Sequence, residues 1–274
     1  MRVLYLGEVV GSSGVYTVKR LLKNFRKERG IDFVIAGGDG ATGGYGTGKN
    51  HSVYLRKLGV DCLTGGECIY YKRDMVAHIE KSPYIVRPAN YLDENPGRGF
   101  EIYNTGGEEI AVIVLLGQAG FDRVHLANPF SRLSELVESI SRRTKRIVID
   151  FHANTTAEKH TMFFHIDGQV SAVIGSHTKV MTTDESISTK GTASITDAGR
   201  TGSSESVGGL EPAIEIEKFL SQIPERSKAA WKRLEMQGII LEIGKDGSAI
   251  GIERIVVPCP GERDEAERND SGAS

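Results

Sequence analysis

Acidic and imidazole side chains recur in this sequence directly after short apolar runs that are typical of β-strands. Five of them are candidate metal ligands: Glu8, Asp39, Glu67, His152 and His177. Because the carboxyl ends of parallel strands share one edge of a sheet, we expect these side chains to converge there. Carboxylate oxygens combined with histidine nitrogens favour Mn, Fe or Zn over Ca. A pair of such ions suits phosphoester hydrolysis, because it stabilises the attacking and the leaving oxygen together.

Each of these residues, taken alone, also has a plainer interpretation. Glu8 could cap the helix that follows it, and Asp39, between glycines, could be a turn residue. Glu67 could be solvated, and His152 could be a core histidine whose hydrogen bonds are satisfied. The shared position of all five residues after strands favours ligation over these alternatives.

The elements that would position these residues alternate between strands and helices over the first 80 residues. Apolar runs predict strands at residues 3–6, 32–36 and 60–64, and amphipathic spacing predicts helices at 15–28, 49–58 and 72–80. A glycine-rich turn is expected at 7–14. Strand–loop–helix–strand units of this kind are typical of a mostly parallel sheet, so the sequence predicts an α/β fold.

The pattern changes after Pro83. The later elements are predicted as a hairpin at 100–103 and 110–116, a helix at 133–143, strands at 146–151 and 170–175, and a hairpin at 237–243 and 249–257. We expect one α/β domain with mixed sheets over residues 1–260, in which 83–129 could form a small subdomain. Residues 261–274 are polar and charged, and we expect them to form a flexible tail.

Composition narrows the classes of function. The 274 residues carry 34 Lys and Arg against 36 Asp and Glu, and the resulting net charge of -2 disfavours a general nucleic-acid binder. The basic run at 142–146 is interpreted as a solvated helix end. Three cysteines cannot make a disulfide framework, and no apolar run approaches the ~20 residues of a membrane span. These features predict a cytoplasmic protein with neither membrane nor nucleic-acid partners.

Nine short segments of the chain resemble the motifs of a known family. They are residues 7–11, 39–46, 87–91, 128–130, 150–153, 175–178, 190–193, 196–197 and 219–224. In this order they resemble the bacterial YmdB-like cyclic-nucleotide phosphodiesterases, a branch of the calcineurin-like metallophosphoesterases. The resemblance implies a four-layer α-β-β-α metallophosphoesterase-type sandwich with mixed sheets, a site for two metal ions, and a homo-oligomer. It also implies a cyclic nucleotide or related phosphodiester as substrate.

Against that family, the first metal position is altered. The family has Asp where this chain has Glu8, and Glu where it has Asp39. It has Asn where this chain has Gly40, and His where it has Lys179. The position therefore lacks an amide and an imidazole, and an ammonium group cannot ligate a metal while it is protonated. We expect Lys179 to replace the charge of the missing cation through an ion pair with Glu8 or Asp39.

The second metal position keeps a competent set of ligands. By the same resemblance it would use Asp39, Glu67, His152 and His177, with Glu67 replacing an Asn of the family. We therefore predict at most one divalent transition metal ion per chain, or none. The family's histidine beside the scissile phosphate is Cys68 here. Because a thiol is a poorer proton donor than an imidazole at that position, we assign no catalytic residue.

Two smaller features leave alternatives open. Cys68 could be a nucleophile or an inert thiol, and the adjacent carboxylate of Glu67 favours the inert thiol. Arg87 and Asn90 could line the site, or they could hold the loop that follows a strand at 84–86.

Two functional hypotheses follow from these residues. The first is a pseudoenzyme with a degenerate di-metal site, impaired or inactive in catalysis, that binds a nucleotide, a phosphodiester or a protein partner as a regulatory or assembly component. The alternative is an active metal-dependent phosphodiesterase that uses a rearranged site with one metal ion. The first is favoured, because one metal position and the family's acid are altered together. A purely structural protein is disfavoured by the ligands that persist after the strands.

Overall fold

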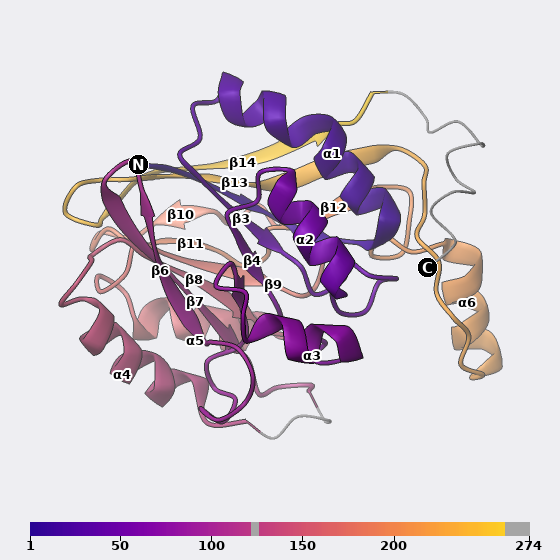
Figure 1. The fold of residues 1–274 in the computed structure, drawn as a ribbon, viewed down its shortest axis with the longest axis horizontal. Helices are drawn as coiled ribbons and strands as arrows, with labels where there is room; N and C mark the ends of the chain where they lie inside the picture. Colours follow the sequence, from indigo (N-terminus) through magenta and orange to yellow (C-terminus); the bar gives the residue numbers. More distant parts are fainter. Residues whose placement is uncertain (122–125, 261–274) are drawn as a thin grey trace.

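The computed structural model describes residues 1–121 and 126–260, which form two β-sheets and the helices that cover them (Figure 1). The segment predicted as a flexible tail, residues 261–274, lies outside the described residues. None of the helices in the described part of the chain is both long enough and apolar enough to cross a membrane.

The first sheet has eight strands in the order β2-β12-β13-β1-β3-β4-β5, with β14 paired to β13. Its parallel part consists of β1 (Arg2–Leu6), β3 (Phe33–Gly37), β4 (Cys62–Thr64) and β5 (Ile85–Val86). The other strands are β2 (Glu8–Val9), β12 (Arg200–Ser203), β13 (Leu234–Ile243) and β14 (Ala249–Pro258). Because β13 runs antiparallel to β1, β12 and β14, the sheet is mixed.

The second sheet has six strands in the order β10-β11-β9-β8-β7-β6. They are β6 (Phe100–Thr105), β7 (Glu108–Leu116), β8 (Ile147–His152), β9 (Ala172–Ser176), β10 (Ser186–Ile187) and β11 (Ala193–Ile195). Strands β7, β8, β9 and β11 are parallel, whereas β6 and β10 pair antiparallel with their neighbours. Residues 83–129 contribute β5 to the first sheet and β6 and β7 to the second.

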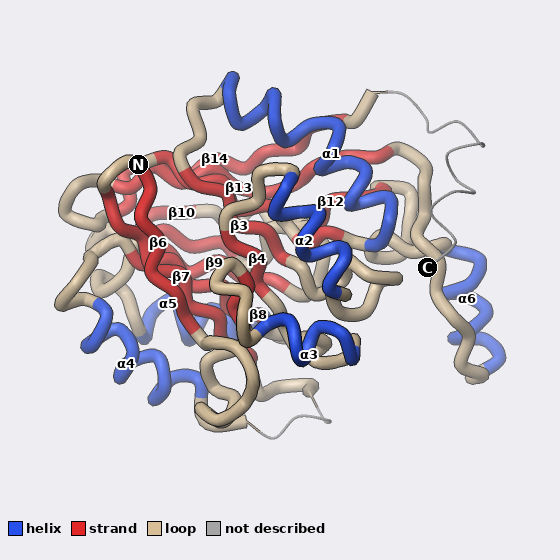
Figure 2. Tube along the Cα trace, viewed as in Figure 1, coloured by secondary structure: helices blue, strands red, loops and turns tan. Residues whose placement is uncertain are grey.

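Alternating side chains along the strands divide the core into three apolar layers. In β1, Leu4 and Leu6 pack toward the helices, whereas Val3 and Tyr5 pack between the sheets. The first sheet is covered by α1 (Gly11–Glu28), α2 (Lys49–Lys57) and α3 (Arg73–Ile79), and the second by α4 (Pro129–Ile140) and α5 (Thr156–His165). Figure 2 shows these two groups of helices on opposite sides of the strands. The predicted four-layer α-β-β-α sandwich with mixed sheets is confirmed.

The structure corrects several local predictions. Residues 7–14 form β2 and the first turn of α1 instead of a glycine-rich turn. This early start is possible because Gly14 lies against β12, where a Cβ would be 2.5 Å from the Thr201 carbonyl oxygen. Helix α4 occupies 129–140 rather than 133–143, since the Asn128 side chain accepts hydrogen bonds from the first amides of that helix. Both predicted hairpins are confirmed as β6–β7 and β13–β14.

Sequence reasoning also missed five further elements, three short strands and two helices of ten residues each. They are β10, β11, β12, α5 and α6 (Pro212–Ser221). The three strands have only two to four residues each, which is too short for an alternating pattern to show. In α6, apolar side chains such as Phe219 are exposed, so burial does not impose a helical pattern there.

Candidate metal centre

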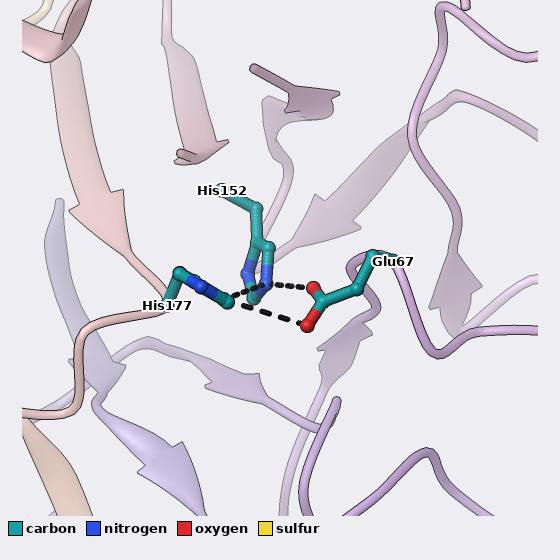
Figure 3. Close-up of side chains that lie close together, drawn as sticks. All are labelled: Glu67, His152 and His177. Carbon is teal, nitrogen blue, oxygen red and sulfur yellow. Dashed lines mark hydrogen bonds and ion pairs between the residues drawn. The ribbon is translucent and has the colours of Figure 1, made fainter. Parts of the chain in front are cut away.

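Three candidate ligands meet where the two sheets face each other. Glu67 follows β4 of the first sheet, His152 ends β8 of the second, and His177 follows β9 of the second (Figure 3). The predicted convergence is therefore found for these three residues, but it does not lie at the edge of one sheet. It needs two sheets, because their packing brings the carboxyl ends of β4, β8 and β9 together.

The three side chains are within reach of one ion. His152 Nε2 lies 2.6 Å from Glu67 Oε2 and 3.1 Å from His177 Nδ1, and His177 Nδ1 lies 3.5 Å from Glu67 Oε1. One potential ligand atom from each residue lies within 4.8 Å of the others. Two ligands at ~2.1 Å from one ion are separated by up to ~4.2 Å. The donor set of one carboxylate and two imidazoles therefore fits a single divalent transition metal ion.

His152 is oriented by a chain of buried hydroxyl and carboxylate groups. Its Nδ1 lies 3.0 Å from Ser176 Oγ, which donates a 2.6 Å hydrogen bond to Asp150. The other oxygen of Asp150 accepts a 2.6 Å hydrogen bond from the Tyr5 hydroxyl, which comes from β1 of the opposite sheet. Since the Ser176 hydroxyl proton is used by Asp150, Ser176 accepts from Nδ1 and leaves Nε2 directed at the site.

The charges of His152 and Glu67 stabilise each other. Burial lowers the pKa of His152, but the nearby carboxylate of Glu67 outweighs this effect and raises the pKa to about 10. Burial raises the pKa of Glu67, yet its contacts with His152 and His177 hold that pKa far below its usual range. His152 and Glu67 therefore form an imidazolium–carboxylate pair in which His152 is buried and Glu67 is partly buried.

Asp39 lies at the margin of this cluster. Its Oδ2 is 3.9 Å from His152 Nε2, and its two oxygens accept hydrogen bonds from the amides of Gly66 and Cys68. Burial, followed by the negative charge of Glu67, raises the pKa of Asp39 to about 7. Asp39 also forms a second group of potential ligands with Glu67 and Cys68. Asp39 also lies in a turn of its own segment, in which the Ala41 amide donates to the Gly38 carbonyl oxygen, so its turn and ligand interpretations are compatible.

The other half of the site contains an ion pair. Lys179 Nζ lies 3.1 Å from Glu8 Oε1, and Glu8 is only 3% exposed. A Cβ placed on Gly40 would lie 2.6 Å from the same Glu8 oxygen, so the longer side chain of Glu8 fills the space beside Gly40. Burial lowers the pKa of Lys179, but the charge of Glu8 raises it by more. The pKa of Lys179 therefore lies above its usual range. The predicted ion pair is present, with Glu8 as the partner.

Two of the plainer interpretations can now be judged. Glu8 does not cap α1, whose N-cap residue is Val10 and which has no side-chain cap. Cys68 is 5% exposed, and burial together with Asp39 raises the pKa of its thiol far above its usual range. The thiol is therefore protonated at neutral pH, as an inert cysteine requires and a thiolate nucleophile does not.

Arg87 and Asn90 hold the loop after β5. The Arg87 guanidinium donates to the carbonyl oxygens of Pro88 and Leu92. The Asn90 side chain donates to the carbonyl of Leu116 at 2.8 Å and accepts from its amide at 3.0 Å. These bonds tie the loop to the end of β7.

Some residues that shape the site have no role in the sequence-based prediction. Asp150 and Ser176 are included only as parts of the segments that resemble the family, and Tyr5 is predicted only as a strand residue. Phe121 was missed entirely, although its ring centroid lies 5.0 Å from that of His177 and 6.3 Å from that of His152. Nothing in a single sequence signals that an aromatic residue from a loop covers two imidazoles.

The basic run predicted as a solvated helix end makes ion pairs. Arg142 pairs with Glu138, Arg143 with Glu109 and Arg146 with Glu108. These partners neutralise much of the positive charge of the run, in keeping with the overall balance of the chain.

The sandwich with its carboxylate–imidazole cluster is the architecture of a metallophosphoesterase. The sequence profile of the family described as "YmdB-like protein" matches residues 4–255, and the chain belongs to this family. A relative from Bacillus subtilis (strain 168), named 2',3'-cyclic-nucleotide 2'-phosphodiesterase, is 35% identical over 260 residues. That match covers 94% of this chain and 97% of the relative.

Two solved structures closely match the fold. The first is a hypothetical protein from Thermus thermophilus, with 32% identity, a TM-score of 0.88, and coverage of 95% of this chain and 100% of the other. The second is described as a novel phosphatase from Mycoplasma pneumoniae, with 28% identity, a TM-score of 0.88, and coverage of 98% and 96%. Chain length and fold are thus shared with these proteins almost from end to end.

Proposed function

We propose that this protein is an active metal-dependent phosphodiesterase that acts on cyclic nucleotides or related phosphodiesters with one metal ion. The observation that carries the proposal is the convergence of Glu67, His152 and His177 on one point. The name of the Bacillus relative supports 2',3'-cyclic nucleotides as the first substrates to test. The proposal reverses the order of our two hypotheses, because the relatives are named as a phosphodiesterase and a phosphatase.

Glu67, His152 and His177 would hold the ion, with Asp39 beside them. The ion would supply Lewis-acid polarisation of a phosphoryl oxygen. The Asp150–Ser176 chain keeps His152 Nε2 directed at the site, and the ring of Phe121 packs against both imidazoles.

Lys179 would provide the second positive charge of the site. Its ammonium lies in the half of the site where the resemblance places the other metal, and it is held by Glu8 at 3.1 Å. A Lys ammonium binds phosphate as a point charge, so Lys179 can attract and orient the substrate without ligating a metal.

A specific observation favours the pseudoenzyme as a second candidate. The Cys68 thiol has a raised pKa and stands where the family has its proton-donating histidine. General acid catalysis contributes about 10²–10⁴-fold in rate, so the loss of this donor would leave a slow enzyme or a binding protein.

The test combines metal analysis with turnover. Purified protein is loaded with Mn²⁺, its metal content is measured, and the hydrolysis of 2',3'-cyclic AMP is followed. We expect one equivalent of metal per chain, and we expect His152→Ala to lower turnover by about 100-fold or more. His165→Ala, at an exposed histidine on α5, is the matched control. Binding of the nucleotide without turnover would favour the second candidate, and turnover that survives His152→Ala would refute the proposed site.

We also propose that the protein works in the cytoplasm as a homo-oligomer. The family resemblance and the small number of cysteines support this proposal. Light scattering coupled to size-exclusion chromatography would measure the oligomer, and a monomer at micromolar concentration would contradict it.

A further inference from the structure

A fully buried ion pair lies beside the metal centre. Lys159 of α5 and Asp197 are each 1% exposed, and Lys159 Nζ lies 3.2 Å from Asp197 Oδ2. Removing two such charges from water is costly, and their attraction compensates only when further hydrogen bonds are formed. The other partners of Asp197 therefore show what the pair holds in place.

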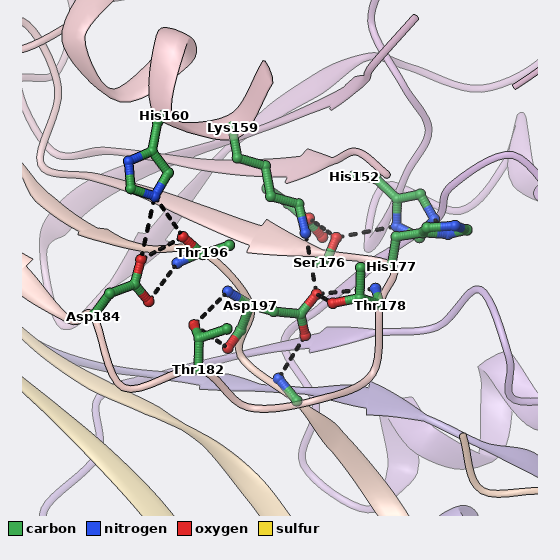
Figure 4. Close-up of polar contacts among 12 residues, drawn as sticks. His152, Lys159, His160, Ser176, His177, Thr178, Thr182, Asp184, Thr196 and Asp197 are labelled. Carbon is green, nitrogen blue, oxygen red and sulfur yellow. Dashed lines mark hydrogen bonds and ion pairs between the residues drawn. The ribbon is translucent and has the colours of Figure 1, made fainter. Parts of the chain in front are cut away.

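Three of these bonds reach segments of the site. Asp197 Oδ2 accepts hydrogen bonds from the backbone amide of Thr178 at 2.9 Å and from its hydroxyl at 2.6 Å. Asp197 Oδ1 accepts from the amide of Gly199 at 2.9 Å. Figure 4 shows the side chain of Asp197 between Lys159 and Thr178, next to His177.

The loop held at Thr178 has an unusual backbone. The residues on either side of Thr178, His177 and Lys179, have φ angles of 95° and 61°. Each such conformation is unfavourable in a residue other than glycine and persists only when its surroundings impose it. Asp197 binds both the amide and the hydroxyl of the residue between them, and Arg200 donates to the Lys179 carbonyl oxygen at 2.9 Å.

The hydrogen bond of Asp197 to Gly199 connects it to Glu8. Gly199, whose amide donates to Asp197, accepts a 3.0 Å hydrogen bond from the Glu8 amide through its carbonyl oxygen. One carboxylate is thus connected to the loop that carries His177 and Lys179, and through Gly199 to the strand that carries Glu8.

We propose that Asp197, with its charge balanced by Lys159, is a positioning residue for this site. It fixes His177 as a metal ligand and sets Lys179 opposite Glu8 by imposing the positive φ angles of residues 177 and 179. The part that concerns the metal rests on the function proposed above. The part that concerns the loop does not depend on it.

The test removes a bond to Asp197 without leaving a buried charge unpaired. Thr178→Val deletes the hydroxyl that donates to the carboxylate, at an exposed residue, and Thr178→Ser keeps that hydroxyl. The matched control is Thr182→Val, because the Thr182 hydroxyl bonds to the backbone of the same Asp197 and not to its carboxylate. Each variant is measured at the same number of degrees below its own Tm.

Two readouts separate the proposal from the proposed function. The first is the Mn²⁺ dissociation constant by calorimetry, which we expect to rise about tenfold in Thr178→Val, to return in Thr178→Ser and to stay within about twofold in Thr182→Val. The second is hydrogen exchange at the amides of residues 177–179 in the metal-free protein. We expect this exchange to be at least about tenfold faster in Thr178→Val alone.

Each outcome has a defined meaning. Unchanged exchange in Thr178→Val, or an equal change in Thr182→Val, would overturn the positioning role whatever the protein does with metal. Faster exchange with unchanged metal affinity would overturn the claim that Asp197 sets the ligand His177. A wild-type protein that binds no Mn²⁺ would refute the proposed function and the role toward the metal, while the exchange data would still decide the role of Asp197 in the loop.

Discussion

The two halves of the site carry their charge in different ways. In one half, the lone pairs of Glu67, His152 and His177 converge and need a cation or a proton, and the pKa of His152, raised to about 10 by Glu67, keeps this histidine protonated. In the other half, Lys179 is itself the cation and Glu8 is its partner. The half with Glu67, His152 and His177 can exchange its proton for a metal ion. The half with Glu8 is already neutralised by the ammonium group of Lys179.

This difference also shows how one half can change without the other. Glu8 extends into the space beside Gly40 and reaches Lys179, so these three residues form one steric and electrostatic unit. Glu67 and His152 are positioned by other contacts, namely those of Asp39 with the 66–68 turn and those of the Asp150–Ser176 chain. If the two halves are independent, a change in one should leave the other largely unaffected.

Neutralising a carboxylate should affect the two halves unequally. Glu67→Gln removes a charged ligand and the partner of His152, so the Mn²⁺ dissociation constant should rise about 100-fold or more. Glu8→Gln, the same change in the other half, should alter that constant by less than about threefold, because Glu8 is paired with Lys179. Calorimetric titration measures both constants. Equal losses would show that the two halves are not independent.

Restoring the family residues in the half with Glu8, Gly40 and Lys179 should add a metal ion only when the changes are combined. Gly40→Asn alone should destabilise the fold by about 1–3 kcal/mol, because its Cβ would lie 2.6 Å from the Glu8 carboxylate. The triple variant Glu8→Asp, Gly40→Asn, Lys179→His removes this clash and should bind two equivalents of metal. Metal analysis and thermal unfolding test both statements. Two equivalents of metal bound to the wild type would contradict the division into one metal-binding half and one ion-paired half.

Metal binding to the half with Glu67, His152 and His177 should depend on pH. Since Glu67 raises the pKa of His152 to about 10, an ion must displace a proton at any lower pH. The affinity for Mn²⁺ should therefore rise by about tenfold or more per pH unit between about pH 6 and 8, because Asp39, whose pKa is about 7, loses a proton beside the ion as well. Calorimetry in buffers of different ionisation enthalpy should detect at least one proton released per ion. No release in the wild type would mean that His152 is already neutral, and Glu67→Gln should show less release.

The smallest expected effect concerns the thiol between the halves. Burial and Asp39 raise the pKa of Cys68, so iodoacetamide at about pH 8 should modify it much more slowly than Cys259, which is half-buried. Mass spectrometry of timed digests would measure both rates. Rapid modification of Cys68 would reopen the nucleophile interpretation.

Sequence reasoning predicted much of the fold where local patterns are strong. The strands at the centre of both sheets and the helices α1 to α3 follow apolar runs and helical spacing, and both hairpins have turn signals. The predicted start of α1 is wrong, because its first turn depends on the close approach of Gly14 to β12. The candidate ligands Glu67, His152 and His177 were predicted because each stands shortly after a strand or at its end, and the structure brings the three together. The residues that orient them, such as Ser176 and Asp197, carry no local signal of that role.

The sequence by itself determined which groups are available: carboxylates and imidazoles after strands, a lysine in place of a histidine, and a glycine in place of an amide. Their chemistry is local, because it depends only on residue type and position along the chain. The tertiary structure decided which groups meet. It placed Glu67 against His152 from opposite sheets, chose Glu8 rather than Asp39 as the partner of Lys179, and buried Asp197 beneath the loop at 177–179. Pairings of this kind depend on how the two sheets pack, which connects residues as far apart in the chain as Glu67 and His152.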